Sequence, residues 1–92
     1  MEIDLNQFYY VYILLSEKDN KHYIGFTSNL EKRFADHNEG KVNSTSYRRP
    51  LKLVYFEASL NKYDVIKREK YFKTGFGRRF LKNRLENFYN SG

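Results

Sequence analysis

The sequence has no cysteine, no tryptophan, a single proline and few acidic residues. Without cysteine, a disulfide scaffold, a thiolate zinc site and a cysteine nucleophile are all excluded, and a reducing compartment is favoured. The apolar runs are no longer than a β-strand, so we expect no membrane contact through a spanning helix. The N-terminus, Met1-Glu2-Ile3-Asp4, lacks the cationic and then apolar pattern of a signal peptide. We therefore expect a cytoplasmic protein.

The shortage of acids leaves the chain strongly basic. Lysine and arginine number 17 against 11 aspartates and glutamates, which gives a formal net charge of +6 over 92 residues. Such a balance favours a polyanionic partner, although simple solubility would also explain it. With 40% hydrophobic and 18% aromatic residues, the chain can form a core, and its length predicts one domain over residues 1–92.

Three segments have the pattern of β-strands: Phe8–Leu15, Lys21–Phe26 and Leu51–Ala58. The first, with the sequence FYYVYILL, is apolar on both faces, which predicts a central strand covered on both sides. Only a short polar turn separates it from the second, so the two should form an antiparallel hairpin.

Three segments have the pattern of helices. Ser28 and Glu31 match a capping box and predict a helix that runs to about Glu39, with Gly40 as the left-handed residue after it. A second helix is expected from Asn61 to about Thr74, ended by Gly75-Phe76-Gly77, and a third over Arg78–Tyr89. The order β-β-α-β-α-α predicts an α+β fold: a small three-stranded antiparallel sheet flanked by helices.

Glu69 breaks the pattern of the second predicted helix. It shares a face with Val65, Ile66 and Phe72, so its carboxylate should point toward the sheet among apolar neighbours. A charge in that place is costly unless it is paired or binds a metal. Taken alone, Glu69 fits a partly buried salt bridge to an arginine better than a metal site.

Two further pairs of residues could carry chemistry. Arg33 and His37 are one helical turn apart, so they share a face, as catalytic groups or as boundary side chains that reach water. Tyr12 and Tyr23 lie on the two hairpin strands, and a register that pairs them directly would put both hydroxyls on one face. Most strand tyrosines are packing residues, so this pair is also ambiguous by itself.

The stretch from Lys67 to Arg84 is almost entirely basic, with Glu69 as its only acid. This imbalance exceeds that of a mixed solvated helix face and favours contact with phosphate groups. The residues that we expect to contact nucleic acid are Arg48, Arg49, Lys67, Arg68, Lys73, Arg78, Arg79 and Lys82.

Taken together, these features resemble the GIY-YIG nuclease superfamily, in particular small stand-alone members similar to the N-terminal nuclease domain of the bacterial excision-repair endonuclease. The resemblance extends from about Phe8 to Phe88. Tyr10-Val11-Tyr12 and Tyr23-Ile24-Gly25 look like the two signature tripeptides. Arg33 matches the family's arginine, and His37 matches the position that holds a histidine or tyrosine in relatives. Glu69 matches the metal-binding carboxylate.

The match departs from the family pattern at three places. Tyr10 replaces the glycine of the first signature and Val11 its isoleucine. Phe26 follows Gly25 where the repair nuclease has a lysine, so that auxiliary cation is absent.

The resemblance implies a metal-dependent endonuclease that hydrolyses DNA phosphodiester bonds, in DNA repair or recombination, with RNA not excluded. Glu69 would hold Mg²⁺ or Mn²⁺, and Arg33 would hold a phosphate oxygen. Tyr23 or Tyr12 would activate water, with help from nearby cations or from His37. The alternative is a non-catalytic nucleic-acid-binding module on the same scaffold. The resemblance also implies that Gly25 lets backbone and substrate approach closely.

Overall fold

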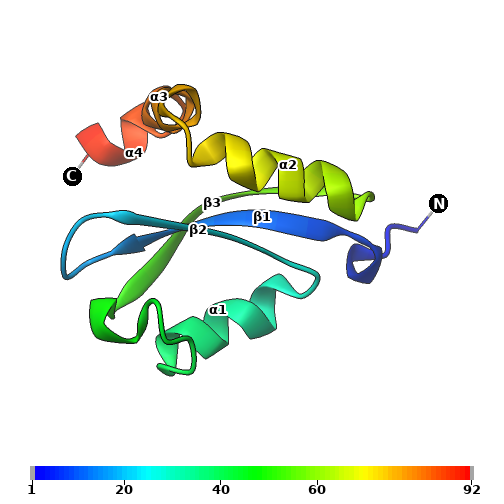
Figure 1. Ribbon diagram of the computed structural model, residues 1–92, viewed down its shortest axis with the longest axis horizontal. Coiled ribbons are helices and arrows are strands. Elements are labelled where there is room, and N and C mark those ends of the chain that lie inside the picture. The colour runs from blue at the N-terminus through cyan, green and yellow to red at the C-terminus, as the bar shows by residue number, and fades with distance from the viewer. Residues whose placement is uncertain (1, 92) are drawn as a thin grey trace.

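The computed structural model describes residues 2–91, which form a three-stranded antiparallel sheet with helices against both faces (Figure 1). The strands are β1 (Tyr9–Ser16), β2 (His22–Thr27) and β3 (Leu51–Ser59), in the order β2-β1-β3. The helices are α1 (Leu30–Asn38), α2 (Lys62–Phe72), α3 (Gly75–Arg84) and the short α4 (Glu86–Asn90). Two 3₁₀ turns, Leu5–Gln7 and Ser46–Arg48, complete the chain. The predicted fold class and element order are confirmed.

The central position predicted for the first strand is also confirmed. β1 pairs with both other strands, and its residues Val11, Tyr12, Ile13 and Leu14 are at most 1% exposed. Because side chains alternate along a strand, β1 supplies both halves of the core. Helices therefore have to cover both of its faces.

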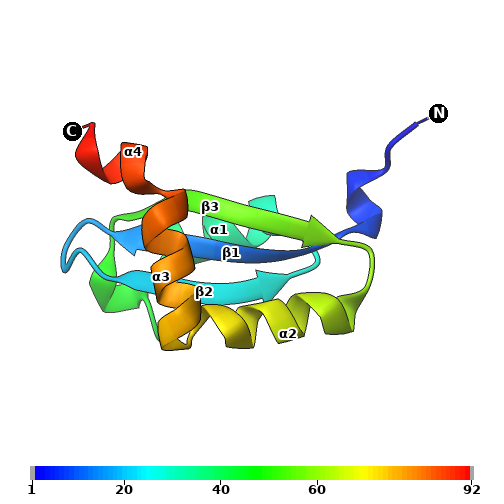
Figure 2. The same ribbon diagram turned by 90° about the horizontal axis from the view of Figure 1, so that it is seen from above.

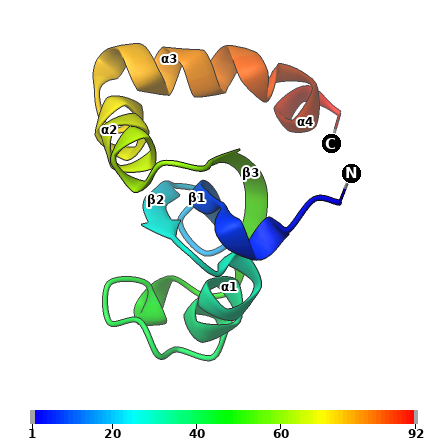
Figure 3. The ribbon, with the colours of Figure 1, turned by 90° about the vertical axis from the view of Figure 1, so that its right-hand side faces the viewer.

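The two halves of the core differ in their helices. Val11 and Ile13 pack with Val65 and Phe72 of α2 and Leu81 of α3. On the opposite face, Leu30 and Phe34 of α1 pack against the Tyr12 and Leu14 side of β1. Figure 3 shows the resulting layers end on, with α1 on one side of the sheet and α2 and α3 on the other. Among residues 2–91, no helix is long and apolar enough to cross a bilayer.

The first helix begins one residue later than the predicted capping box. Asn29 is the N-cap, and its side chain accepts a hydrogen bond from the Lys32 backbone N–H at 3.1 Å. β2 continues as far as Thr27, whose hydroxyl accepts from the Asn29 N–H and so fixes Asn29 at the cap. The box of Ser28 and Glu31 is therefore wrong, whereas Gly40 has the predicted left-handed conformation, with φ of 77°.

The break between the second and third helices also lies earlier than predicted. α2 ends at Phe72, and Thr74 caps α3 by accepting a hydrogen bond from the Gly77 N–H. The two glycines thus belong to the first turn of α3 instead of separating the helices. The predicted third helix is itself divided at Leu85, where α3 gives way to α4.

Candidate active site

The hairpin register puts Tyr12 and Tyr23 on one face of the sheet without pairing them directly. Tyr12 lies opposite Gly25, and Tyr23 lies opposite Leu14. The register thus differs from direct pairing by two residues, and an offset of two residues preserves the face of a strand residue. The two rings lie 6.3 Å apart between centroids, on the side of the sheet that α1 covers.

Gly25 makes room for the Tyr12 ring. A Cβ atom on Gly25 would lie 2.6 Å from the Tyr12 hydroxyl oxygen and 2.7 Å from Cζ. Such contacts are far inside van der Waals distance, so only glycine fits opposite Tyr12. Gly25 is therefore closely approached by the Tyr12 side chain of the neighbouring strand, and the approach of a substrate to Gly25 stays a prediction.

His37 is fully buried, so the alternative of a boundary side chain that reaches water is wrong for this residue. Its Nε2 lies 2.8 Å from the Tyr12 hydroxyl, and its Nδ1 lies 2.7 Å from the Thr45 hydroxyl. Burial, with a further contribution from the nearby Arg33 charge, lowers the pKa of His37 to about 4. The imidazole is therefore neutral at physiological pH.

The neutral ring has one donor and one acceptor nitrogen, and the contact with Thr45 indicates which nitrogen carries the proton. The Thr45 oxygen lies 2.7 Å from Nδ1 of His37 and 3.5 Å from the Val42 carbonyl, and we assign its proton to Val42, so that it accepts from Nδ1–H. Nε2 is then the acceptor of the Tyr12 hydroxyl proton. The chain of hydrogen bonds thus runs from Tyr12 through His37 to Thr45.

Arg33 is a second neighbour of the Tyr12 side chain. Side-chain hydrogen bonding with Tyr12 raises the pKa of the Arg33 guanidinium, so it stays charged. Burial raises the pKa of Tyr12, and the neighbouring Arg33 only partly offsets that effect. Tyr12 therefore keeps its proton at neutral pH and is poorly suited to be the base.

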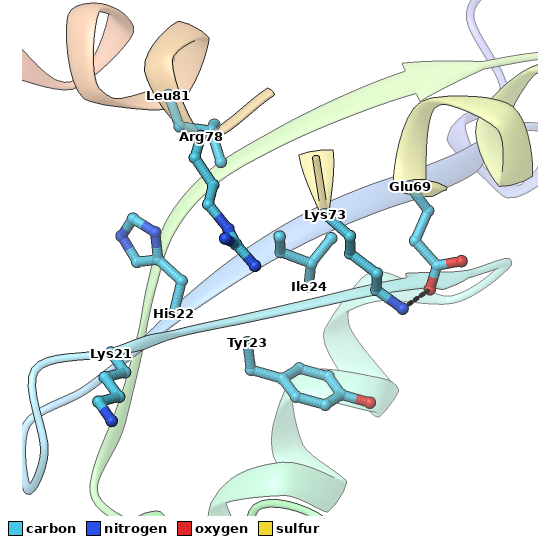
Figure 4. Close-up of a pocket in the computed structure, with 8 residues that line it drawn as sticks. All are labelled: Lys21, His22, Tyr23, Ile24, Glu69, Lys73, Arg78 and Leu81. Atoms are coloured by element: carbon cyan, nitrogen blue, oxygen red, sulfur yellow. Dashed lines mark ion pairs between the residues drawn. The ribbon is translucent and has the colours of Figure 1, made fainter. Parts of the chain in front are cut away.

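Glu69 reaches this site from the opposite layer. β2 is an edge strand, and α2 runs beside it (Figure 2), so a side chain on α2 can project past the edge. Glu69 and Tyr23 line one hollow of roughly 550 Å³, shown in Figure 4. The charge of Glu69 is close enough to influence the Tyr12 hydroxyl. The remaining lining residues are Lys21, His22, Ile24, Lys73, Arg78 and Leu81.

Within residues 2–91, Glu69 does not form the expected ion pair with an arginine. Its carboxylate is instead 3.6 Å from Nζ of Lys73, one turn along α2, and its side chain is 16% exposed. An exposed lysine paired in this way contributes only about 0.3–0.5 kcal/mol. Among residues 2–91, no group of three or more acids and histidines could enclose a metal ion. A metal at this place would have Glu69 as its protein carboxylate and complete its shell with other oxygens.

Three of the predicted phosphate-binding arginines form ion pairs or hydrogen bonds with other groups of the protein. Arg48 forms an ion pair of 2.8 Å with Asp19 and donates to two backbone carbonyls. Arg49 donates to backbone carbonyls of the loop and of α1. Arg68 binds Glu57 through two nitrogens at 2.8 and 3.0 Å and lies over three aromatic rings. Their guanidinium groups hold structural elements together, which leaves fewer donors for a phosphate.

The other five predicted cations are exposed at the surface of α2 and α3. Lys73 and Arg78 line the hollow beside Glu69, and Lys82 follows Arg78 by one turn on α3. These five are Lys67, Lys73, Arg78, Arg79 and Lys82.

Sequence reasoning missed several residues around the site. Thr45 is buried in a polar loop, and nothing in its local pattern marks it as the partner of a histidine. The sequence pattern marks Lys21 and His22 only as the start of a strand, yet both line the hollow. His22 also contacts the Tyr89 hydroxyl of α4. These contacts depend on the packing of loops and of the C-terminal helix.

Comparison with known proteins identifies the family of this chain. Residues 8–90 match the family described as the GIY-YIG catalytic domain. The chain is 46% identical over 67 residues to a UPF0213 protein of Staphylococcus haemolyticus, covering 72% of this chain and 80% of the relative. It is 41% identical over 69 residues to UPF0213 protein YazA of Bacillus subtilis, covering 74% and 67%. A UPF0213 protein of Clostridium perfringens is 51% identical over 65 residues, covering 70% and 69%. The chain therefore belongs to the GIY-YIG family, a nuclease superfamily, and is related to its small UPF0213 proteins.

Proposed function

We propose that this protein is a divalent-metal-dependent endonuclease that hydrolyses DNA phosphodiester bonds, in DNA repair or recombination. One observation carries the proposal: a lone carboxylate, Glu69, lies in a cationic hollow together with a tyrosine of the second signature, Tyr23. A charged arginine, Arg33, lies next to the tyrosine of the first signature. A carboxylate among cations weakens phosphate binding, so its presence there favours catalysis over simple binding.

The donor set suits Mg²⁺ or Mn²⁺. These are hard ions that take oxygen ligands, and Mg²⁺ is commonly held by one or two carboxylates together with water and substrate phosphate. Glu69 offers one carboxylate that is mostly shielded from solvent yet borders an open hollow. When bound, the ion would polarise the phosphate and stabilise the leaving oxygen.

The remaining chemistry is assigned to the chain's own residues. Arg33 would hold a non-bridging phosphate oxygen and offset the negative charge that develops during attack. Tyr23 borders the hollow and would orient the attacking water. Tyr12, whose proton is directed at His37, would position Arg33 and Tyr23 without acting as the base.

The alternative function is a nucleic-acid-binding module without catalysis. It accounts for the exposed cations of α2 and α3, but it assigns no task to Glu69 or to the buried hydrogen bond of Tyr12 with His37. A protein-interaction module explains the basic surface poorly.

The test is Glu69→Gln, which keeps the size of the side chain and removes its charge. We expect a folded variant that binds DNA as well as the parent or slightly better and does not cleave it. The measurements are the melting temperature, DNA affinity in chelator, and cleavage of a panel of labelled DNA and RNA structures with Mg²⁺ or Mn²⁺.

Glu17→Gln is the matched control, because Glu17 is an exposed acid outside the hollow. It should leave cleavage unchanged. Cleavage by Glu69→Gln at close to the parental rate would contradict the proposed metal site at Glu69. A parent that binds every substrate and cuts none, with either ion, would support the binding module instead.

A further inference from the structure

Lys73 occupies a particular place in the hollow, and the inference drawn from it rests on the proposed metal site. Its ammonium lies 3.6 Å from the Glu69 carboxylate and is the one ion-pair partner that Glu69 has within residues 2–91. Figure 4 shows both side chains directed into the hollow above Tyr23, Glu69 from α2 and Lys73 from the C-cap of that helix. The carboxylate that a divalent ion would bind is therefore already next to a positive charge.

The ion pair is built to be exchangeable. The Lys73 side chain is 55% exposed, and water competes with the carboxylate for the ammonium group. The distance exceeds that of a direct charge-assisted hydrogen bond, which is typically about 2.7–2.9 Å. A lysine has a flexible four-carbon stem and three donors that rotate freely, so it can leave one anion for another without backbone movement.

The hollow also gives Lys73 a second place to act. Arg78 lines the same hollow from α3, so a phosphate placed against Glu69 and Tyr23 would have both cations in reach. Once the carboxylate is neutralised by another cation, the ammonium is repelled from that ion and attracted to the phosphate. The Lys73 ammonium would move only a short way, because Glu69 and Tyr23 line the same hollow.

We propose that Lys73 is the exchangeable counter-cation of Glu69. In the metal-free protein it holds the carboxylate and competes with divalent ions. In the complex with metal and DNA it leaves Glu69 and contacts the phosphate that is to be cleaved. Lys73 would then weaken metal binding in the absence of substrate and still be needed for fast cleavage.

The test compares Lys73→Gln with the parent in two measurements. The first is Mn²⁺ affinity of the protein without DNA, by calorimetry or by the electron paramagnetic resonance signal of free Mn²⁺. We expect binding to tighten by about threefold to tenfold, since a unit charge a few ångströms from the ion is removed. The second is the cleavage rate at saturating Mn²⁺, which should fall by at least about tenfold as a phosphate contact is lost.

Lys70→Gln is the matched control because it removes the same charge from an exposed position on α2 that does not line the hollow. It should leave Mn²⁺ affinity within about twofold of the parent, as expected for a more distant, screened charge. Glu69→Gln identifies the binding that belongs to this site, because only that fraction should disappear in this variant.

The outcomes separate this inference from the proposed function. If Mn²⁺ binding depends on Glu69 but Lys73→Gln does not tighten it, the role of Lys73 is overturned and the metal site stands. If binding tightens and cleavage stays equal or rises, Lys73 only inhibits and the phosphate contact is overturned. If the parent shows no binding that depends on Glu69, both ideas fail.

Discussion

At the scale of single residues, the site is organised around the proton of Tyr12. His37 accepts that proton, and the charged Arg33 side chain is also hydrogen-bonded to Tyr12. Because the His37 ring is buried and held by Thr45, it cannot turn away from Tyr12 without leaving a polar group unpaired. The hydroxyl and the guanidinium are therefore kept in place before any substrate arrives.

Replacing Arg33 should impair cleavage far more than binding. Its proposed contribution is to charge that develops in the transition state, and loss of one such contact typically costs about a hundredfold in rate or more. Arg33→Ala should weaken DNA affinity by less than about tenfold, as expected for one lost charge among several. Lys32→Ala removes the same charge from the neighbouring exposed position of α1 and should affect neither strongly. Equal losses of binding and rate in Arg33→Ala would make Arg33 a simple phosphate anchor.

His37 should make the protein less stable in mild acid. Its pKa falls from an ordinary value of 6.5 to about 4 on folding, so between these values the unfolded chain binds the proton more readily. Above pH 6.5 the protonation of His37 does not reduce the free energy of unfolding. As the pH falls from 6.5 toward 4, this group lowers that free energy by up to about 3 kcal/mol. Asp19, whose pKa Arg48 lowers to about 2, adds its own loss mainly below pH 4.

The measurement is an NMR titration of the His37 ring beside the melting temperature at the same pH values. The ring should remain neutral down to about pH 4. A midpoint near 6.5 in the folded protein would contradict both the burial of His37 and its neutral hydrogen bond to Tyr12.

The residues of the site were predictable to different degrees. Glu69 could be found because a carboxylate on an apolar helix face breaks a pattern. Tyr12, Tyr23 and Arg33 could be found through the ordered signatures. Thr45 could not, because a threonine in a polar loop has no periodic neighbour that reports its burial.

At the scale of elements, the path of α3 depends on one close contact of backbones. A Cβ atom on Gly77 would lie 2.1 Å from the Tyr71 carbonyl oxygen and 2.5 Å from Cα of Phe72. The first turn of α3 is thus pressed against the last turn of α2. This contact sets the direction in which α3 leaves α2 and carries Arg78 to the hollow.

Gly77→Ala and Gly75→Ala form a matched pair on this turn. The added methyl at Gly77 meets backbone that cannot move aside, so the free energy of unfolding should fall by about 3 kcal/mol. Nothing lies within 4 Å of the corresponding atom at Gly75, so alanine there should be neutral or stabilise by ~0.5 kcal/mol. Urea unfolding of both variants measures the difference. Equal stability would mean that α3 does not cross α2 at this point.

Element boundaries show what local pattern can and cannot determine. The strands were predicted to within one residue at each end because aromatic and branched residues end sharply at polar turns. The cap of α1 was predicted one residue early, since Ser28 and Asn29 are both good caps and the length of β2 decides between them. The glycines of α3 were interpreted as a break, because a sequence does not show that a glycine is needed for a helix crossing.

At the scale of the whole molecule, the count of 17 lysines and arginines overstates the number of cations available to a polyanion. Arg48 and Arg68 are bound to Asp19 and Glu57, so their charges serve the fold. Lys73, Arg78 and Lys82 are exposed, and the first two border the hollow with Glu69. DNA would therefore be drawn to the side of the molecule where α2 and α3 meet the edge of β2.

The separation of ion-paired arginines from exposed cations predicts which side chains determine the salt dependence of DNA binding. On duplex DNA, log affinity should fall with log salt by about 0.9 per phosphate contact. The double variant Arg78→Gln with Lys82→Gln removes two exposed charges one turn apart on α3, so the slope should become shallower by about 1.8. Its stability should be unchanged, because neither side chain has an ion-pair partner among residues 2–91.

Arg48→Gln is the opposite case and completes the comparison. It removes one charge of the same sign, but that charge is held by Asp19 and two carbonyls next to the β1–β2 turn. We expect a lower melting temperature with a salt slope that stays within about 0.3 of the parental value, since no phosphate contact is lost. The readout is DNA affinity over a salt series on several unrelated sequences, alongside thermal unfolding of each variant. If Arg48→Gln flattens the slope as much per charge as the α3 variant does, the DNA surface extends over the hairpin, and the separation between structural and binding cations is wrong.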